Sequence, residues 1–331
     1  MSIFKDKVIL ITGGTGSWGN ELTNQLLEKK PKKIIIYSRS ELGQVNMLRK
    51  INNPKVKFVI GDVRDREQLT KASIGVDYIF HLAALKHIPI CEEQPEEAIK
   101  TNILGVQNVI AAAKENGVKK VIDVSTDKAV DPFNFYGMTK AVGERLIINA
   151  NLHSSKTRFV CIRGGNVLGT NGSIVPFFIE QIHNTKTVTI THKEMTRYYM
   201  TQKQAIHLLF KAAENSFGGE TFVMKMPTCK VVDLAEVLIE EIGNKNKKIS
   251  LRETGIRPGE KMHECLIGKN EFSSAYQYDE NHYIILPQVK IDGLKEKYKN
   301  LKKITCGDFS SSDVLMNKQE IKKMLKDGNF I

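Results

Sequence analysis

The stretch Lys7-Val-Ile-Leu-Ile-Thr-Gly-Gly-Thr-Gly-Ser-Trp-Gly19 contains the signal that decides the fold. Its first half is a short apolar run, typical of a buried strand. Glycines then recur at a spacing of three, and a helical pattern begins at once. Glycines let the backbone turn tightly and approach a pyrophosphate, whose charge then lies at the helix N-terminus. The alternative is a tight strand–helix turn that binds no ligand. We predict a dinucleotide-binding turn made of Gly13, Thr15, Gly16, Ser17, Trp18 and Gly19.

The pattern that starts there continues to about residue 165. Short β-branched runs occur at 33–37, 57–60, 78–81, 120–124 and 159–162, and most of the stretches between them have helical spacing. Apolar strands that alternate with helices predict a parallel sheet covered on both faces. The predicted fold class is therefore α/β, a doubly wound Rossmann sheet. We place the dinucleotide-binding domain at 1–165 and a smaller substrate-binding lobe at 166–331, with some strands and helices shared. Helical patterns reappear at roughly 202–215 and 232–242.

Composition excludes several other classes of protein. The chain has 331 residues and a net charge of +12, but its basic residues form separate clusters, such as Lys245 to Lys248 and Lys295 to Lys303. Nucleic-acid binding needs a continuous basic stripe, so we expect none. No apolar run approaches the ~18 residues that span a bilayer, so we also expect no membrane segment. The five cysteines, Cys306 among them, form no CxxC pair. We therefore expect neither disulfides nor a metal site, and a cytoplasmic location.

The ends of the second and third strands bear on the type of dinucleotide. Ser38 and Arg39 stand where an NAD site usually has an acidic residue that holds the ribose 2′-hydroxyl. A guanidinium would pair with a 2′-phosphate, so NADP is favoured over NAD, although Glu41 nearby keeps NAD open. Asp62, followed by Val63, is placed to meet the adenine amino group. A plain helix N-cap is the other interpretation of Asp62.

Tyr136 and Lys140 are four residues apart and share one face of a predicted helix. A lysine ammonium beside a phenol stabilises the phenolate, which can then take a proton from a hydroxyl while hydride leaves the carbon. Spacing alone decides nothing, because Tyr199–Lys203 and Tyr298–Lys302 have it too. Position does decide, because only Tyr136 lies just beyond a buried strand, Val121 to Ser125, whose carboxyl end should face the cofactor.

That strand ends in Ser125-Thr126-Asp127-Lys128. Thr126 is placed to hydrogen-bond a sugar hydroxyl, and Asp127 and Lys128 put an acid and a base at the cleft. A simple dehydrogenase needs only the Tyr–Lys pair. A second acid/base pair therefore indicates further proton transfers, unless it is a surface ion pair that opens a loop.

These motifs resemble a known family. Together with Leu82-Ala83-Ala84, they are similar to the extended short-chain dehydrogenase/reductases that act on nucleotide sugars. Further segments resemble the inverting UDP-N-acetylglucosamine 4,6-dehydratases of the bacterial pseudaminic acid pathway, which makes flagellar and surface glycans. The resemblance runs from about residue 5 to about residue 270. The segments are Tyr37 to Leu42, Leu85 to His87, Ser125 to Ala129, Gly165 to Gly169, Gly172 to Phe177, Met195 to Arg197 and Gly255 to Lys261.

The resemblance implies roles for residues that patterns alone leave open. It implies UDP-N-acetylglucosamine as substrate and a homo-oligomer, with a hexamer as one candidate. In the implied reaction Tyr136 takes the C4 hydroxyl proton, a neutral Lys128 takes the C5 hydrogen, and a protonated Asp127 donates to the departing C6 hydroxyl. The implied cofactor residues are those named above with Leu82, Ala83 and Ala84. The implied substrate residues are Lys86, Asn166, Val175, Arg197, Arg257 and Glu260, with His87 beside the nicotinamide or sugar pocket.

Other functions stay open at this point. The same reaction could stop at the 5,6-ene product. A UDP-sugar 4-epimerase would use the Tyr–Lys pair without needing Asp127 or Lys128, and its product would not be lighter by one water. A non-catalytic nucleotide-binding regulator would keep the fold and turn over no sugar. His263 and Cys265 do not form an HExxH motif, and we interpret them as structural.

Overall fold

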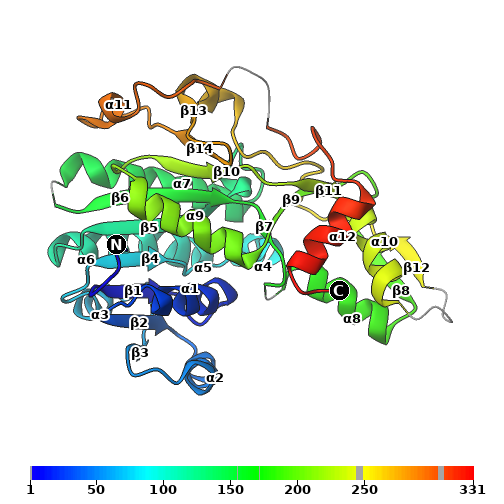
Figure 1. Ribbon diagram of the computed structural model, residues 1–331, viewed down its shortest axis with the longest axis horizontal. Helices are drawn as coiled ribbons and strands as arrows, with labels where there is room; N and C mark the ends of the chain where they lie inside the picture. Colours follow the sequence, from blue (N-terminus) through cyan, green and yellow to red (C-terminus); the bar gives the residue numbers. More distant parts are fainter. Residues whose placement is uncertain (1, 155, 171, 244–248, 305–308) are drawn as a thin grey trace.

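The computed structural model describes residues 2–154, 156–170, 172–243, 249–304 and 309–331. Within these ranges a nine-stranded sheet has the order β13-β14-β10-β6-β5-β4-β1-β2-β3 (Figure 1). All neighbours from β6 to β3 are parallel. The doubly wound α/β prediction is therefore confirmed. These strands are β1 (Val8–Thr12), β2 (Lys33–Ser38), β3 (Val56–Ile60), β4 (Tyr78–His81), β5 (Lys120–Thr126) and β6 (Arg158–Gly164).

Helices cover both faces of this sheet because its strands are apolar on both sides. Along β1, Ile9 and Ile11 join a core with residues of α1 and α9, whereas Leu10 joins a core with residues of α3, α6 and α7. α2 borders β2 and β3. These helices are α1 (Ser17–Glu28), α2 (Glu41–Ile51), α3 (Arg66–Ala72), α6 (Gly105–Glu115), α7 (Phe135–Asn149) and α9 (Gln202–Asn215).

Residues after 165 contribute strands to the same sheet. β10 (Thr221–Met224) lies parallel to β6, and β14 (His282–Ile285) and β13 (Ala275–Gln277) extend that edge in antiparallel fashion. Sequence patterns had indicated no strand at these positions. A division at residue 165 thus cuts through the main sheet, and the sheet is parallel only in part.

The remaining elements form a lobe beyond one end of the sheet (Figure 1). The lobe has a hydrophobic core of its own, separate from the two cores on the faces of the sheet. This core includes Val175, Phe178, Leu234, Leu238 and Ile321. The helical patterns at 202–215 and 232–242 correspond to α9 and α10. The lobe contains α8 (Ile174–Asn184), α10 (Val231–Ile242), α12 (Lys318–Asp327), the pair β8 (Thr187–Ile190) and β12 (Ser250–Glu253), and the sheet of β7 (Asn166–Val167), β9 (Thr196–Met200) and β11 (Thr228–Lys230).

Shorter elements connect these units. α4 and α5 lead into η1, a π-helical turn that continues into α6, while η2 directly follows β5. Their bounds are α4 (Ile88–Glu93), α5 (Pro95–Ile99), η1 (Lys100–Leu104), η2 (Asp127–Ala129), η3 (Ala150–His153), η4 (Lys269–Ser274) and α11 (Leu294–Lys297).

Some sequence predictions concern residues outside the described ranges. The Lys245 to Lys248 cluster and Cys306 are among them. Among the described cysteines, Cys91, Cys161 and Cys229 are buried free thiols. None of the helices within the described ranges is both long and apolar enough to cross a lipid bilayer. In the same part of the chain, no three His, Cys, Asp or Glu side chains gather as metal ligands would.

Candidate active site

A cavity of about 650 Å³ lies at the carboxyl ends of β1 to β6. Each of these strands places the residues that follow it, or its own last residues, in the cavity wall, as expected for an open parallel sheet. The start of α8 and Tyr199 of β9 close the wall from the lobe side. The predicted site residues that line it are Gly13, Thr15, Gly16, Ser17, Trp18, Gly19, Ser38, Arg39, Asp62, Val63, Leu82, Ala83, Ala84, Lys86, Thr126, Lys128, Tyr136, Lys140, Asn166 and Val175.

The loop between β1 and α1 fits a pyrophosphate. No side chain caps α1 at Gly16, and its first turn carries no acidic residue. The backbone N–H groups of that turn therefore present positive partial charge to the cavity. Gly13 has φ +65°, and a Cβ there would lie 2.8 Å from Ala83 Cα. Asn20 Nδ2 donates to the carbonyl oxygens of Thr15 and Gly16, both at 2.9 Å. The loop is thus held in the conformation that a dinucleotide needs.

The cavity wall beyond β2 and β3 carries both charged groups named from the sequence, Arg39 and Asp62. Arg39 is exposed at the wall. Asp62 is paired with Arg64, at 2.7 Å between carboxylate and guanidinium. Burial raises the pKa of Asp62, but the hydrogen bonds and charge of Arg64 outweigh it and leave the pKa below its usual value. Asp62 is therefore an ion-paired carboxylate rather than a bare N-cap.

Tyr136 stands in the first turn of α7, where Asn134 caps the helix by accepting from Gly137 N–H at 2.7 Å. Burial raises the pKa of Tyr136, while Lys140 and Lys128 act in the opposite direction. The net pKa of Tyr136 is raised, because desolvation of the phenol outweighs the two cations. The direction expected of Lys140 itself is confirmed.

Asp123 was missed as a site residue, although it interrupts the apolar run of β5. It is fully buried, and its Oδ2 lies 3.5 Å from Lys140 Nζ. Burial lowers the pKa of Lys140, but Asp123 and the other acidic groups around it together outweigh burial and raise the pKa overall, so Lys140 stays charged. His81 lies on the other side, with Nε2 4.0 Å from Asp123 Oδ1 and Nδ1 2.7 Å from Thr12 Oγ1. Burial lowers the pKa of His81 to about 3, so this histidine is neutral.

Lys128 lines the cavity, whereas Asp127 lies fully buried behind it. Lys128 Nζ is 3.0 Å from Asp127 Oδ1 and 3.4 Å from Glu264 Oε1. Burial lowers the pKa of Lys128, but the two carboxylates outweigh burial and raise it well above its usual value. The role that the resemblance implies for Lys128 requires a neutral amine, whereas this arrangement favours the charged form. Direct donation from Asp127 to a sugar is also not available here, because Asp127 has no exposed surface.

Arg197, Arg257 and Glu260 stand outside the cavity wall drawn by the described residues. Arg197 is buried, and its Nη1 donates to the carbonyl oxygens of Thr196 at 2.7 Å and Met262 at 3.2 Å. Arg257 is exposed and lies 4.0 Å from Glu260. The structure therefore does not bring these predicted substrate residues to the cavity.

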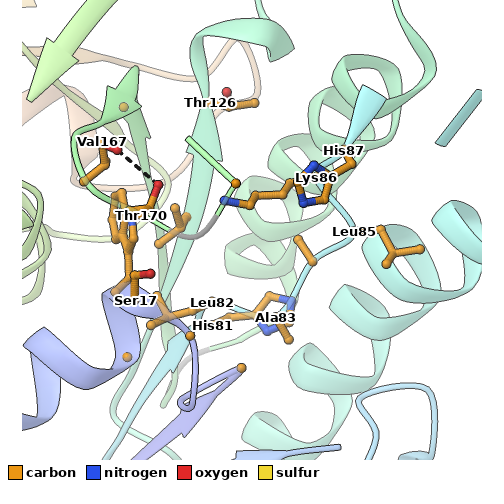
Figure 2. A pocket seen from close by; sticks show the side chains of 18 of the residues that line it. Ser17, His81, Leu82, Ala83, Leu85, Lys86, His87, Thr126, Val167 and Thr170 are labelled. Atoms are coloured by element: carbon orange, nitrogen blue, oxygen red, sulfur yellow. Dashed lines mark hydrogen bonds between the residues drawn. The ribbon is translucent and has the colours of Figure 1, made fainter. Parts of the chain in front are cut away.

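Figure 2 shows Lys86 extending from the segment after β4 into the cavity, with His87 next to it. Burial lowers the pKa of Lys86. Thr170 donates to the carbonyl oxygen of Val167 at 3.1 Å and so fixes the loop before α8 (Figure 2). Sequence analysis had missed Thr170, Ser173 and Tyr199 as lining residues, because their places depend on how the lobe packs against the sheet.

Comparison of the sequence with known proteins identifies the family of this chain. Residues 9–286 match the family described as "Polysaccharide biosynthesis protein". An inverting UDP-N-acetylglucosamine 4,6-dehydratase of Campylobacter jejuni is 46% identical over 292 residues, which cover 87% of this chain and 85% of that protein. A UDP-glucose 4-epimerase of Rickettsia canadensis is 39% identical over 337 residues, covering 99% and 98%.

The X-ray structure of Pen from Bacillus thuringiensis superposes with a TM-score of 0.93 at 38% identity, covering 99% of both chains. The family match and the identity to the Campylobacter jejuni enzyme confirm the resemblance to nucleotide-sugar dehydratases that the motifs had indicated. The chain therefore belongs to the polysaccharide biosynthesis protein family.

Proposed function

We propose that this chain is an NADP-dependent UDP-N-acetylglucosamine 4,6-dehydratase that inverts C5. The observation that carries the proposal is the position of Lys128. Its ammonium faces the same cavity as Tyr136 and Lys140, and the buried Asp127 and Glu264 lie behind it. An epimerase needs only the tyrosine and lysine of α7, so a further titratable pair at the end of β5 favours elimination of water. The resemblance alone supports pseudaminic acid synthesis as the pathway and a cytoplasmic location.

The cavity suits a nicotinamide dinucleotide, because the uncapped start of α1 receives a pyrophosphate and Arg39 stands ready for a 2′-phosphate. When bound, such a cofactor supplies the hydride acceptor and donor for oxidation at C4 and reduction at C6. Tyr136 Oη takes the proton from the C4 hydroxyl. Lys140, kept charged by Asp123, stabilises the phenolate that this step requires.

Lys128 carries the elimination in this proposal, because it is the member of the acid/base pair that reaches the cavity. As a neutral amine it takes the proton from C5, which the C4 ketone has made acidic. The resulting ammonium gives a proton to the C6 oxygen, the C6–O bond breaks, and water leaves. Asp127 acts through Lys128 by its 3.0 Å contact and does not touch the sugar.

Three of the predicted substrate residues, Lys86, Asn166 and Val175, line the cavity wall, and we assign Asn166 and Val175 to the UDP portion. Arg197, Arg257 and Glu260 serve the diphosphate and nucleoside only in a complex where their segments approach the cavity. We retain them as proposals on the resemblance.

The second candidate is a UDP-sugar 4-epimerase, favoured by the Rickettsia relative that matches nearly the whole chain. The deciding experiment incubates purified protein with UDP-N-acetylglucosamine in deuterated water and analyses the product by mass spectrometry and NMR. A dehydratase yields a product lighter by one water, with deuterium and inverted configuration at C5. A 5,6-ene shows the same loss of water without reduction at C6. An unchanged sugar mass with altered C4 configuration contradicts the proposal and assigns the epimerase.

Lys128→Met tests the residue assignment in the same assay. We expect oxidation at C4 to persist and elimination to fall about 10²–10⁴-fold, the usual contribution of a general acid or base. Lys203→Met, which removes an exposed lysine of α9, is the matched control and should leave both steps unchanged. Elimination at the normal rate in Lys128→Met would remove the role assigned to Lys128.

A further inference from the structure

Glu264 is a buried carboxylate at the junction of sheet and lobe that no motif had indicated. Its exposed fraction is 2%. Ser311 fixes the backbone of this residue, because Glu264 N–H donates to Ser311 Oγ at 2.9 Å and Ser311 N–H donates to the Glu264 carbonyl oxygen at 2.8 Å. Cys265 also forms an antiparallel bridge with Ser310. A late segment of the chain therefore holds this carboxylate behind the cavity wall.

Two carboxylates compete for the single ammonium of Lys128, and they are bonded unequally. Asp127 Oδ1 accepts from the Thr126 hydroxyl at 2.9 Å and from Lys128 Nζ at 3.0 Å. Glu264 Oε1 lies 3.4 Å from Lys128 Nζ and 3.9 Å from Arg197 Nε, and its buried Oε2 accepts no hydrogen bond. Each carboxylate therefore keeps one buried oxygen without a hydrogen-bond partner among the described residues, Asp127 Oδ2 and Glu264 Oε2, but only Asp127 is held by two hydrogen bonds at its other oxygen.

The surroundings of Glu264 also favour its taking a proton. Burial raises the pKa of Glu264, and the nearby Asp127 adds to this, while Lys128, Arg197 and Lys261 oppose it. The net direction is upward. The remaining ionisable neighbour across β9 is Tyr198, itself kept neutral by burial, which raises its pKa. Glu264 is thus a carboxylate next to Lys128 that can be protonated without breaking a hydrogen bond.

We propose that Glu264 is a positioning residue that accepts a proton from Lys128 Nζ when substrate fills the cavity. This inference rests on the proposed function, since it explains how Lys128 becomes the base at C5. An N–H bond of Lys128 breaks, an O–H bond forms on Glu264 Oε1, and a neutral amine remains facing the sugar. Arg197, 3.9 Å away, orients the same carboxylate. The proton returns to Lys128 when product leaves.

Glu264→Gln removes the acceptor while keeping size and shape. In deuterated water with UDP-N-acetylglucosamine, we measure exchange at C5 by NMR and C4 oxidation by the absorbance of reduced nicotinamide in a single turnover. We expect C5 exchange to fall about 10- to 100-fold near neutral pH and C4 oxidation to stay unchanged. The deficit should shrink at high pH, because the glutamine variant lacks one of the two carboxylates that raise the pKa of Lys128, and hydroxide can then deprotonate the lysine.

Two further variants make the test decisive. Glu264→Asp keeps a carboxylate and should recover part of the C5 exchange. If the glutamine variant does not fold, the C5 exchange rate of Glu264→Asp is compared with that of the wild type instead. Glu253→Gln changes a partly exposed carboxylate that pairs with His192, and it should leave both steps unchanged.

Faster C5 exchange in Glu264→Gln at neutral pH would overturn the inference, because Glu264 would then only keep Lys128 charged. An unaltered pH profile would overturn it too. If the wild-type protein shows neither C5 exchange nor loss of water, the proposed function itself fails. Wild-type exchange with an unaffected Glu264→Gln variant refutes the Glu264 role alone.

Discussion

Arg39 lies at the end of β2, exposed at the cavity wall, where a dinucleotide would present its 2′ position. We predict that Arg39→Ala weakens NADP binding about 10- to 100-fold, the equivalent of one charge-assisted hydrogen bond. NAD affinity should change little. Titration calorimetry with both dinucleotides measures this. Equal losses for NADP and NAD would show that Arg39 does not contact a 2′-phosphate.

Single residues were predictable from the sequence where a strand end decides their place. Gly13, Thr126 and Lys140 belong to this kind, because the carboxyl ends of parallel strands meet at one edge. Glu264 was not predictable, since its contact with Lys128 joins residues 136 positions apart through a fold that no local pattern encodes. The charge of Lys128 was not predictable for the same reason, because its pKa depends on Asp127 and on the distant Glu264 together.

At the scale of secondary-structure elements, the side chain of Arg163 links β6, α7 and η4 through hydrogen bonds. It stands on β6, is buried, and donates to Glu144 of α7 at 2.8 Å and 3.1 Å. It also donates to Glu271 of η4 at 2.8 Å and 3.0 Å, and to the carbonyl oxygen of Leu266 at 2.8 Å. A guanidinium can satisfy this many acceptors because its five donors form a fixed fork. The segment that carries Glu264 is thereby tied to the sheet.

Glu271→Gln should destabilise the fold by about 1.5–3 kcal/mol at neutral pH, as expected for losing hydrogen bonds to a charged group. Burial raises the pKa of Glu271, but Arg163 outweighs burial, so the pKa lies below its usual value of 4.5. A carboxyl group with a lowered pKa stabilises the fold above its unfolded pKa and loses this contribution as pH falls. The difference between wild type and variant should therefore shrink below about pH 4.5.

Urea unfolding at neutral and acidic pH measures this difference. The control is Glu253→Gln, whose surface pair with His192 should contribute less than about 1 kcal/mol. A wild-type advantage that is the same at both pH values would contradict the ionic role of Glu271.

Elements were predicted well where the period of apolar residues is clear, as in β1 to β6 and α9. The strands β10, β13 and β14 were missed because each is only three or four residues long and, unlike β4, none lies in the regular strand–helix alternation of the first 165 residues. Short apolar runs of that length do not distinguish strand from helix. Their assignment to the main sheet depends on β6 offering its free edge, which is a tertiary property.

At the scale of the whole molecule, the resemblance implies a homo-oligomer, and a second copy of this chain is the occupant we propose for one apolar face. Ile99, Leu104, Met138 and Val142 are each 38–45% exposed on α5, η1 and α7, which pack on one another. We predict that light scattering finds an oligomer and that Met138→Glu shifts it toward smaller species. Leu48→Glu, an exposed apolar residue on α2, is the control. A monomeric wild-type protein would contradict the prediction.

The bonds from Ser311 to Glu264 also set an order of events during synthesis on the ribosome. The strands that build the dinucleotide half emerge first, yet the carboxylate behind Lys128 gains its anchor only after residue 311 has left the exit tunnel. Under the proposed function, a nascent chain would therefore complete its nucleotide-binding strands before the carboxylate that serves Lys128 is anchored, and water loss would be the later of the two capabilities.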